Sequence, residues 1–147
     1  MLVRDDIRVI EEAHRRWFNA LALARETAPA VAVGDPGLLQ ALVRADPVGL
    51  ASRELAGRAQ THLPPVGRLA SIDGPADVLT AWSERIWTPH TEVLGPFEGD
   101  DGAPTRLVLR TPLREGGDLA ALLHVAQSER SAAKLPAVRV RIDPQSF

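Results

Sequence analysis

Cysteine and tyrosine are absent from this sequence of 147 residues, and aromatic side chains are few, with three tryptophans and three phenylalanines. Without cysteine the chain cannot form disulfides or thiolate zinc sites and has no cysteine nucleophile, which excludes a disulfide-stapled secreted domain. The scarcity of aromatic side chains argues against an extensive base-stacking platform for nucleic acid.

Long apolar runs are also missing. The longest stretches, such as residues 28–33, fall far short of the roughly 20 residues that a membrane-spanning helix needs. No basic segment followed by an apolar one marks a signal peptide at Met1. The composition, 45% hydrophobic and 24% charged, is that of a globular chain with one domain or one and a half. We therefore expect a soluble, cytoplasmic protein that does not bind membranes.

Lysine is nearly absent, because arginine supplies 16 of the 17 basic residues and Lys134 is the exception. The net charge of −2 hides a gradient: residues 1–50 carry −1, residues 51–100 carry −3 and residues 101–147 carry +2. The last third of the chain is therefore its basic third. Arginine is the side chain that pairs with phosphate through two parallel hydrogen bonds and stacks on bases.

The first 60 residues carry helical patterns. Within residues 4–23 apolar side chains recur along one side of a helix, at Ile7, Ile10, Trp17 and Leu21. Residues 38–43 predict a short second helix, and Asp46 with Pro47 predicts the capped start of a third that runs to about residue 60. The best candidate for a domain boundary is Leu63-Pro64-Pro65.

After this boundary strands and helices alternate. Strands are predicted at residues 66–72, 91–94, 105–110 and 138–142. Helices are predicted to begin at Asp73-Gly74-Pro75 and at Gly116-Gly117-Asp118. The order β-α-β-β-α-β is typical of a split βαβ sandwich, with two helices on one face of a four-stranded, mostly antiparallel sheet. We therefore predict an α+β fold preceded by a mainly helical segment.

Arginines alternate with apolar residues in the predicted strands. The polar side holds Arg106 and Arg110 in one strand and Arg139 and Arg141 in another. If the helices cover the apolar side, these arginines share the other face, and Arg68 on the first strand is expected between them. A patch of arginines on one face suits a phosphate backbone, because each neutralised phosphate releases counterions. The alternative is a solvated face on which arginine only provides solubility.

Three segments resemble one known family, in the same order and with the same spacing. They are residues 53–58 with 63–65 (RELAGR and LPP), residues 93–96 (VLGP) and the ending VRVRIDPQSF at residues 138–147. The family is that of primosomal protein N′ (PriA), the helicases of replication restart. The chain is similar to the degenerate members from some high-GC bacteria, which lack a working ATPase.

The resemblance implies a division into two parts. Residues 64–147 correspond to the C-terminal α+β domain that binds DNA and partner proteins. Residues 1–63 correspond to a helical remnant of the second helicase lobe and its connector. We therefore expect one folded domain with an incomplete neighbour, acting in the cytoplasm at the nucleoid.

The implied function is to bind branched or single-stranded DNA without sequence specificity and to dock partners of replication restart. The expected phosphate contacts are Arg68, Arg106, Arg110, Arg139 and Arg141. The implied partners include other primosome proteins and the acidic C-terminal tail of single-stranded DNA-binding protein (SSB). Arg110 and Arg114 lie where the family has a basic residue that meets this tail, and Trp87 is a candidate wall of an apolar pocket beside it.

Signals for enzymatic chemistry are missing. The sequence has no GxxxxGK[ST] or GxGxxG phosphate loop and no GxSxG elbow, so we expect no ATPase and no other catalytic activity in this chain. The histidines His14, His62, His90 and His124 lack metal-ligand spacing, and they are expected to be ordinary surface or capping residues, with no metal or cofactor.

Two alternatives remain open. One is a protein-interaction module whose arginines meet acidic tails and never contact DNA; the low overall charge and few aromatic residues favour it modestly. The other is an enzyme on the same fold with His62 or His124 as general base, which requires a pocket where that histidine meets a carboxylate.

Overall fold

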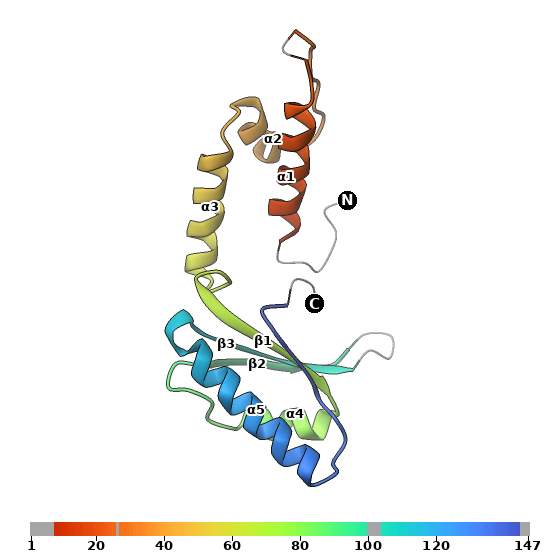
Figure 1. Cartoon of the computed structure of the whole chain (residues 1–147), viewed down its shortest axis with the longest axis vertical. Helices are drawn as coiled ribbons and strands as arrows, with labels where there is room; N and C mark the ends of the chain where they lie inside the picture. Colours follow the sequence, from red (N-terminus) through yellow and green to blue (C-terminus); the bar gives the residue numbers. More distant parts are fainter. Residues whose placement is uncertain (1–7, 26, 100–103, 145–147) are drawn as a thin grey trace. The chain divides into compact units, whose positions relative to one another are not determined.

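The computed structural model of the chain describes residues 8–25, 27–99 and 104–144 (Figure 1). Two compact units divide the chain, one within residues 1–57 and the other at residues 58–144. Ile7 and the last three residues of the closing segment, 145–147, lie outside the described residues.

The N-terminal unit is helical, as predicted. It contains α1 (Val9–Ala22), α2 (Pro36–Val43) and most of α3 (Pro47–Gln60). Asp35 caps α2 by accepting a hydrogen bond from the backbone N–H of Gly37 at 2.8 Å. Asp46 does the same for α3, accepting from Gly49 N–H at 2.7 Å, so the predicted cap is confirmed.

The buried residue of α1 is a histidine rather than the predicted apolar stripe. Ile10 and Leu21 are exposed, whereas His14 is buried. The His14 ring lies between two backbone carbonyls, with Nδ1 2.8 Å from the oxygen of Ile10 and Nε2 2.7 Å from that of Leu38. The expectation of a surface or capping histidine was wrong at this position, because the ring links α1 to α2.

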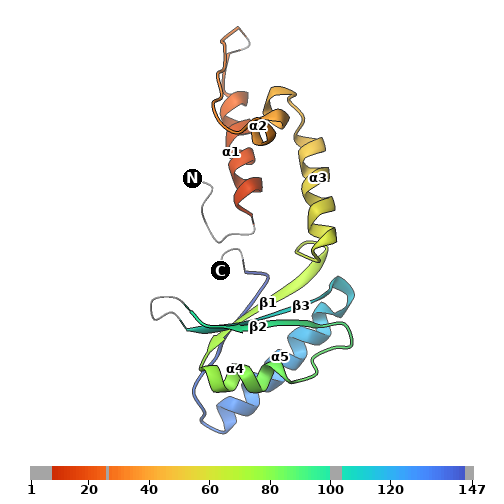
Figure 2. The same cartoon turned by 180° about the vertical axis from the view of Figure 1, so that it is seen from behind.

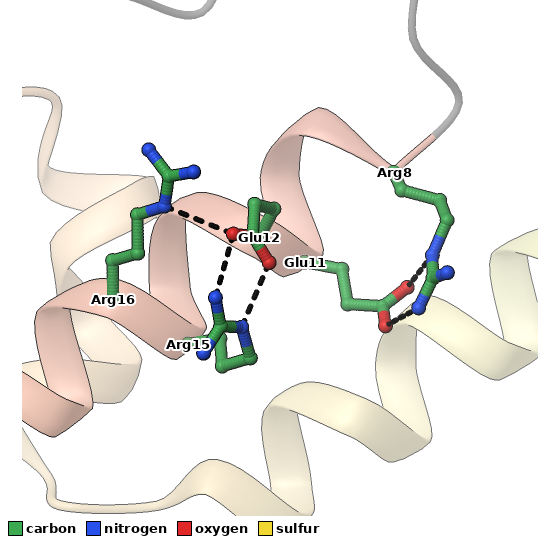
Figure 3. Close-up of polar contacts among 5 residues, drawn as sticks. All are labelled: Arg8, Glu11, Glu12, Arg15 and Arg16. Carbon is green, nitrogen blue, oxygen red and sulfur yellow. Dashed lines mark hydrogen bonds and ion pairs between the residues drawn. The ribbon is translucent and has the colours of Figure 1, made fainter. Parts of the chain in front are cut away.

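Two separate groups of ion pairs lie on the exposed side of α1, one between Arg8 and Glu11 and the other around Glu12 (Figure 3). Glu12 accepts hydrogen bonds from Arg15 at 2.7 Å and from Arg16 at 2.9 Å. These two arginines, Arg15 first, lower the pKa of Glu12 to about 2. Because the pairs are exposed to water, they support the helix only modestly.

The C-terminal unit has the predicted order of elements. Its strands are β1 (Gly67–Gly74), β2 (Glu92–Phe97), β3 (Thr105–Pro112) and β4 (Arg139–Ile142), and its helices are α4 (Ala76–Ser83), the short 3₁₀ helix η2 (Leu113–Glu115) and α5 (Gly116–Ala132). The strand order is β2-β3-β1-β4, and every pairing is antiparallel. The predicted α+β fold with a four-stranded antiparallel sheet is therefore confirmed.

Helices α4 and α5 lie on the same face of the sheet, as both views show (Figures 1 and 2). The core between these layers is apolar. Its members from the strands include Ala70, Ile72, Leu107 and Leu109, and Val138 joins it from the segment just before β4. Helix α5 contributes Leu119, Leu123 and Ala126. Because side chains alternate along a strand, the neighbours of these sheet residues point to the opposite face.

Candidate nucleic-acid interface

The face of the sheet opposite α4 and α5 is called here the arginine face. Antiparallel pairing places Asp73 beside Arg106 on β3 and beside Arg139 on β4, while Leu69 pairs with Arg110 and Ser71 with Arg141. Paired residues point to the same side of a sheet. The structure therefore brings together four of the five predicted arginines, namely Arg106, Arg110, Arg139 and Arg141.

One aspartate organises two of these arginines. The Asp73 carboxylate is only 8% exposed, and its two oxygens accept hydrogen bonds from Arg106 Nε at 2.6 Å and from Arg141 Nη2 at 3.0 Å. The two arginines come from the strands on either side of β1, so Asp73 holds both guanidinium groups close to the sheet. We call Arg106, Arg139 and Arg141 the arginine row.

Arg139 differs from the other members of the row. It is exposed, and within the described residues its side chain has no hydrogen-bond or ion-pair partner. Arg106 and Arg141 thus share the Asp73 carboxylate, and Arg139 adds a third positive charge to the same face. Guanidinium groups gathered on one face can hold an anion such as phosphate.

Arg68 lies on the other face. It alternates with Ala70 and Ile72, which belong to the core, and its stem packs against Gly116 at the start of α5. Its guanidinium pairs with Asp143, whose second oxygen accepts from the backbone N–H of Leu69 at 3.1 Å. The prediction that Arg68 joins the other arginines was wrong, because the two-residue period of a strand turns it to the helix side.

Arg110 ends the arginine face with a partner of its own. Its Nε donates to Glu92 Oε2 at 3.1 Å, its Nη2 donates to the same oxygen, and its Nη1 donates to the carbonyl of Thr61 at 2.5 Å. His62 Nδ1 lies 3.2 Å from the other oxygen of Glu92. Arg110 first, and His62 second, lower the pKa of Glu92 below its usual range.

A pocket of about 560 Å³ opens beside Arg110. Its apolar walls include Val66, Pro89 and Pro112. Its polar lining comes from His62, His90, Thr91, Glu92, Arg110 and Thr111. The pocket therefore combines an apolar surface with one arginine, which is the chemistry predicted for a tail ending in an aromatic residue and a carboxylate.

The other two predicted partner contacts lie elsewhere. Trp87 is 4% exposed, belongs to the core, and donates its ring N–H to the carbonyl of Trp82 at 3.1 Å. Arg114 is 71% exposed on η2 and lies 3.6 Å from the Glu115 carboxylate, outside the pocket lining. The prediction that Trp87 walls the pocket was wrong, because packing against Trp82 removes its ring from the surface.

Glu115 fixes the segment that forms one side of the pocket. Its carboxylate is buried, accepts from the hydroxyl of Thr88 at 2.5 Å and lies 2.5 Å from His90 Nδ1. The Thr88 hydrogen bond and the contact with His90 lower the pKa of Glu115, although burial acts in the opposite direction. These bonds tie residues 88–90 to η2.

The histidines do not assemble a reactive centre. His62 meets the Glu92 carboxylate beside the pocket, as a general base would require, but Arg110 already neutralises that carboxylate. His124 is exposed on α5. Within residues 8–25, 27–99 and 104–144 no cluster of three or more metal-ligating side chains exists, and no described helix has the length and apolar character to cross a bilayer.

The sequence patterns did not identify three candidate functional residues: Asp73, Glu92 and Phe97. Asp73 was assigned to a helix start, although it alternates with Leu69 and Ser71 and so continues the polar side of β1. Glu92 lies in a predicted strand, but no local pattern indicates its partner Arg110, which is 18 residues away. Phe97 lies three residues beyond the predicted end of that strand at residue 94, whereas β2 extends to it.

Comparisons with known proteins agree with this architecture. The sequence model of the family described as "Primosomal protein N C-terminal domain" matches residues 59–145. This match covers more than half of the chain, including the whole four-stranded sheet.

Relatives that carry the name "Probable replication restart protein PriA" occur in Mycobacterium tuberculosis, Mycobacterium bovis and Mycobacterium leprae. The first two are 35% identical over 169 aligned positions and the third is 34% identical over 170, in each case across 98% of this chain. The chain spans about a quarter of the length of these relatives, 26% for the first two and 25% for the third. Their similarity and the matched domain show that this chain belongs to the family of the primosomal protein N C-terminal domain.

Proposed function

We propose that this chain serves replication restart by binding DNA phosphates, without sequence readout, through the arginine row. In this proposal residues 64–147 are the DNA- and partner-binding domain and residues 1–63 a helicase-lobe remnant. Branched or single-stranded DNA is the substrate, and the protein acts in the cytoplasm at the nucleoid. The similarity to replication restart proteins supports the proposal, and one observation carries it: Asp73 aligns two arginines beside the exposed Arg139.

The arrangement suits phosphate for two reasons. Three arginine side chains gather on one face of the sheet, and their positive charge favours an anion. The hydrogen bonds that the two arginines donate to Asp73 also restrict the guanidinium groups before binding, so less side-chain freedom is lost when a phosphate is contacted. Neither feature selects a base, so we expect recognition by charge and shape.

The test is binding to a labelled fork and to a labelled single strand at several salt concentrations. Three phosphate contacts predict a log-log salt slope of about −2 on the single strand. The variant Arg106→Ala/Arg139→Ala/Arg141→Ala should bind weakly and lose most of that slope.

A matched variant, Arg25→Ala/Arg44→Ala/Arg53→Ala, removes the same charge from exposed positions of the helical unit. It should keep most of the affinity. Equal losses in the two variants would mean that net charge alone drives binding, and no binding by the wild-type chain at low salt would reject the DNA function.

A second candidate function is docking of the acidic C-terminal tail of SSB, together with other primosome proteins. The pocket beside Arg110 favours it, because apolar walls and an arginine that already binds a carboxylate suit a tail with an aromatic end. Arg114 is exposed and lies four residues after Arg110 in the sequence. We propose it as a secondary contact with the acidic residues of the tail.

Fluorescence anisotropy with a labelled acidic peptide that ends in phenylalanine tests this docking. Arg110→Ala should weaken binding by about tenfold or more, because a charge-assisted hydrogen-bonded pair is lost. Arg114→Ala should weaken it less. Unchanged affinity in Arg110→Ala would exclude this pocket as the docking site.

A further inference from the structure

Phe97 reaches the arginine face through an irregularity in β2. Leu94 pairs with Val108 and Phe97 pairs with Arg106, so three steps along β2 match two steps along β3. Without the extra residue, Phe97 would alternate with Val93 and point to the core side. The bulge therefore turns Phe97 to the side of Arg106, which is a known use of β-bulges near binding sites.

Gly95 makes this bulge sterically feasible. Its φ is +99°, a conformation that glycine adopts readily and other residues avoid. A Cβ atom at this position would lie 2.9 Å from Phe97 Cδ2 and 3.0 Å from the carbonyl oxygen of Arg106. The Phe97 ring therefore packs directly over the glycine.

The result is an exposed aromatic ring in line with the arginine row. Phe97 is 53% exposed, and it is the one described aromatic residue with more than half of its surface accessible. Register places Phe97, Arg106, Asp73 and Arg139 on a single line across β2, β3, β1 and β4. Cross-strand neighbours have Cα atoms about 5 Å apart, so the ring lies within reach of a base whose phosphate contacts Arg106.

We propose that Phe97 stacks on one unpaired base of a single DNA strand whose phosphates bind the arginine row. This inference rests on the proposed DNA function and adds the substrate class to it: single-stranded DNA, or the unpaired end of a fork, is preferred over duplex. A duplex presents the same phosphates but keeps its base faces stacked, so Phe97 has nothing to stack on. Stacking on an aromatic side chain accepts any base, which agrees with binding without sequence readout.

The experiment compares wild type, Phe97→Ala and Phe97→Trp on three DNAs of equal length. These are a single strand, a blunt duplex and a single strand whose central residues are abasic. Ile86→Ala, an exposed apolar position of the same unit, is the matched control.

Phe97→Ala should weaken binding to the normal single strand by about tenfold, within the usual range for one stacked base. Its affinity for the duplex and the abasic strand should match wild type, and its salt slope should be unchanged because no charge is lost. Phe97→Trp should bind the single strand at least as well as wild type, whereas Ile86→Ala should change nothing.

Two results overturn the inference. If Phe97→Ala binds the normal single strand like wild type, or loses the same factor on all three DNAs, Phe97 does not stack on a base. In either case the arginine-row variant still tests the DNA function independently. Absence of binding to every DNA by wild type rejects the DNA function and this inference with it.

Discussion

The two ends of the arginine face use the same residue type in opposite ways. At one end two arginines, Arg106 and Arg141, share the carboxylate of Asp73, which is 8% exposed, and Arg139 lies exposed on the same face. At the other end one arginine, Arg110, meets one carboxylate, Glu92, which is 45% exposed, and a backbone carbonyl. At the first end two arginines share one carboxylate, whereas at the second end one arginine meets one carboxylate.

From this difference we infer that the number of arginines per carboxylate governs which ligand each end prefers. An excess of arginine suits a polyanion such as DNA, whose phosphates need several cations in a row. A neutral pair beside an apolar pocket suits a ligand that exchanges its own carboxylate for the internal one.

Removing the shared carboxylate should destabilise the domain most. Asp73→Ala removes the carboxylate that the half-buried Arg106 and Arg141 share, and we expect a loss of about 3 kcal/mol in the free energy of unfolding. Glu92→Ala at the other end should cost less than about 1 kcal/mol, because that pair is exposed. Urea denaturation of the two variants measures the contrast, and equal losses would contradict it.

Disturbing the β2 bulge should have an intermediate effect on the free energy of unfolding. Gly95→Ala forces an alanine to a φ of +99° against the Phe97 ring, and we expect a loss of about 1 to 3 kcal/mol. Gly57→Ala, at a helical position of α3 where a Cβ meets nothing within 4 Å, should instead stabilise by about 0.5 to 1 kcal/mol. Thermal unfolding of both variants checks the signs.

Neutralising Glu92 should strengthen docking of an acidic tail. Glu92→Gln keeps the size of the side chain and an acceptor for Arg110 but removes the competing charge, so we expect about fivefold tighter binding of the labelled peptide. Glu84→Gln, on an exposed glutamate outside the pocket, is the control. The affinity for a peptide with an amidated C-terminus should increase less in Glu92→Gln, since that peptide lacks the terminal carboxylate.

Acid should weaken the Arg110 end through a small but specific effect. Because the pKa of Glu92 is lowered in the folded protein, its contribution to stability is present above its ordinary value of 4.5 and is lost as pH falls through the lowered pKa. Between pH 7 and pH 3 wild type should therefore lose more stability than Glu92→Gln. If the free energy of unfolding falls equally with pH in the two proteins, the Arg110–Glu92 pair does not contribute to stability.

Local patterns were sufficient for the elements and for most of the arginine face. The punctuation at Asp73-Gly74-Pro75 and Gly116-Gly117-Asp118 marked where α4 and α5 begin, because glycine, proline and aspartate interrupt one backbone conformation and start another. Alternation in residues 105–110 and 138–142 put four arginines on one side. The same alternation, counted through Ala70 and Ile72, would also have excluded Arg68.

Packing and register could not be predicted from these patterns. Trp87 and Phe97 are both aromatic residues near the ends of elements, yet the first is buried beside Trp82 and the second is turned outwards by a bulge. The sequence around each residue is compatible with either outcome. The difference arises from which neighbours are available once the helices cover the sheet.

Three features follow from the sequence alone: the order of strands and helices in the α+β unit, the helical N-terminal segment, and the placing of arginines at alternating strand positions. Each of them depends on neighbouring residues and their conformational preferences. Only the tertiary structure decided which carboxylate each arginine meets. Asp73 lies 33 residues from Arg106 and 68 from Arg141, and strand register alone makes them neighbours. A shift of one residue in that register would turn the carboxylate to the other face and leave the arginines unpaired.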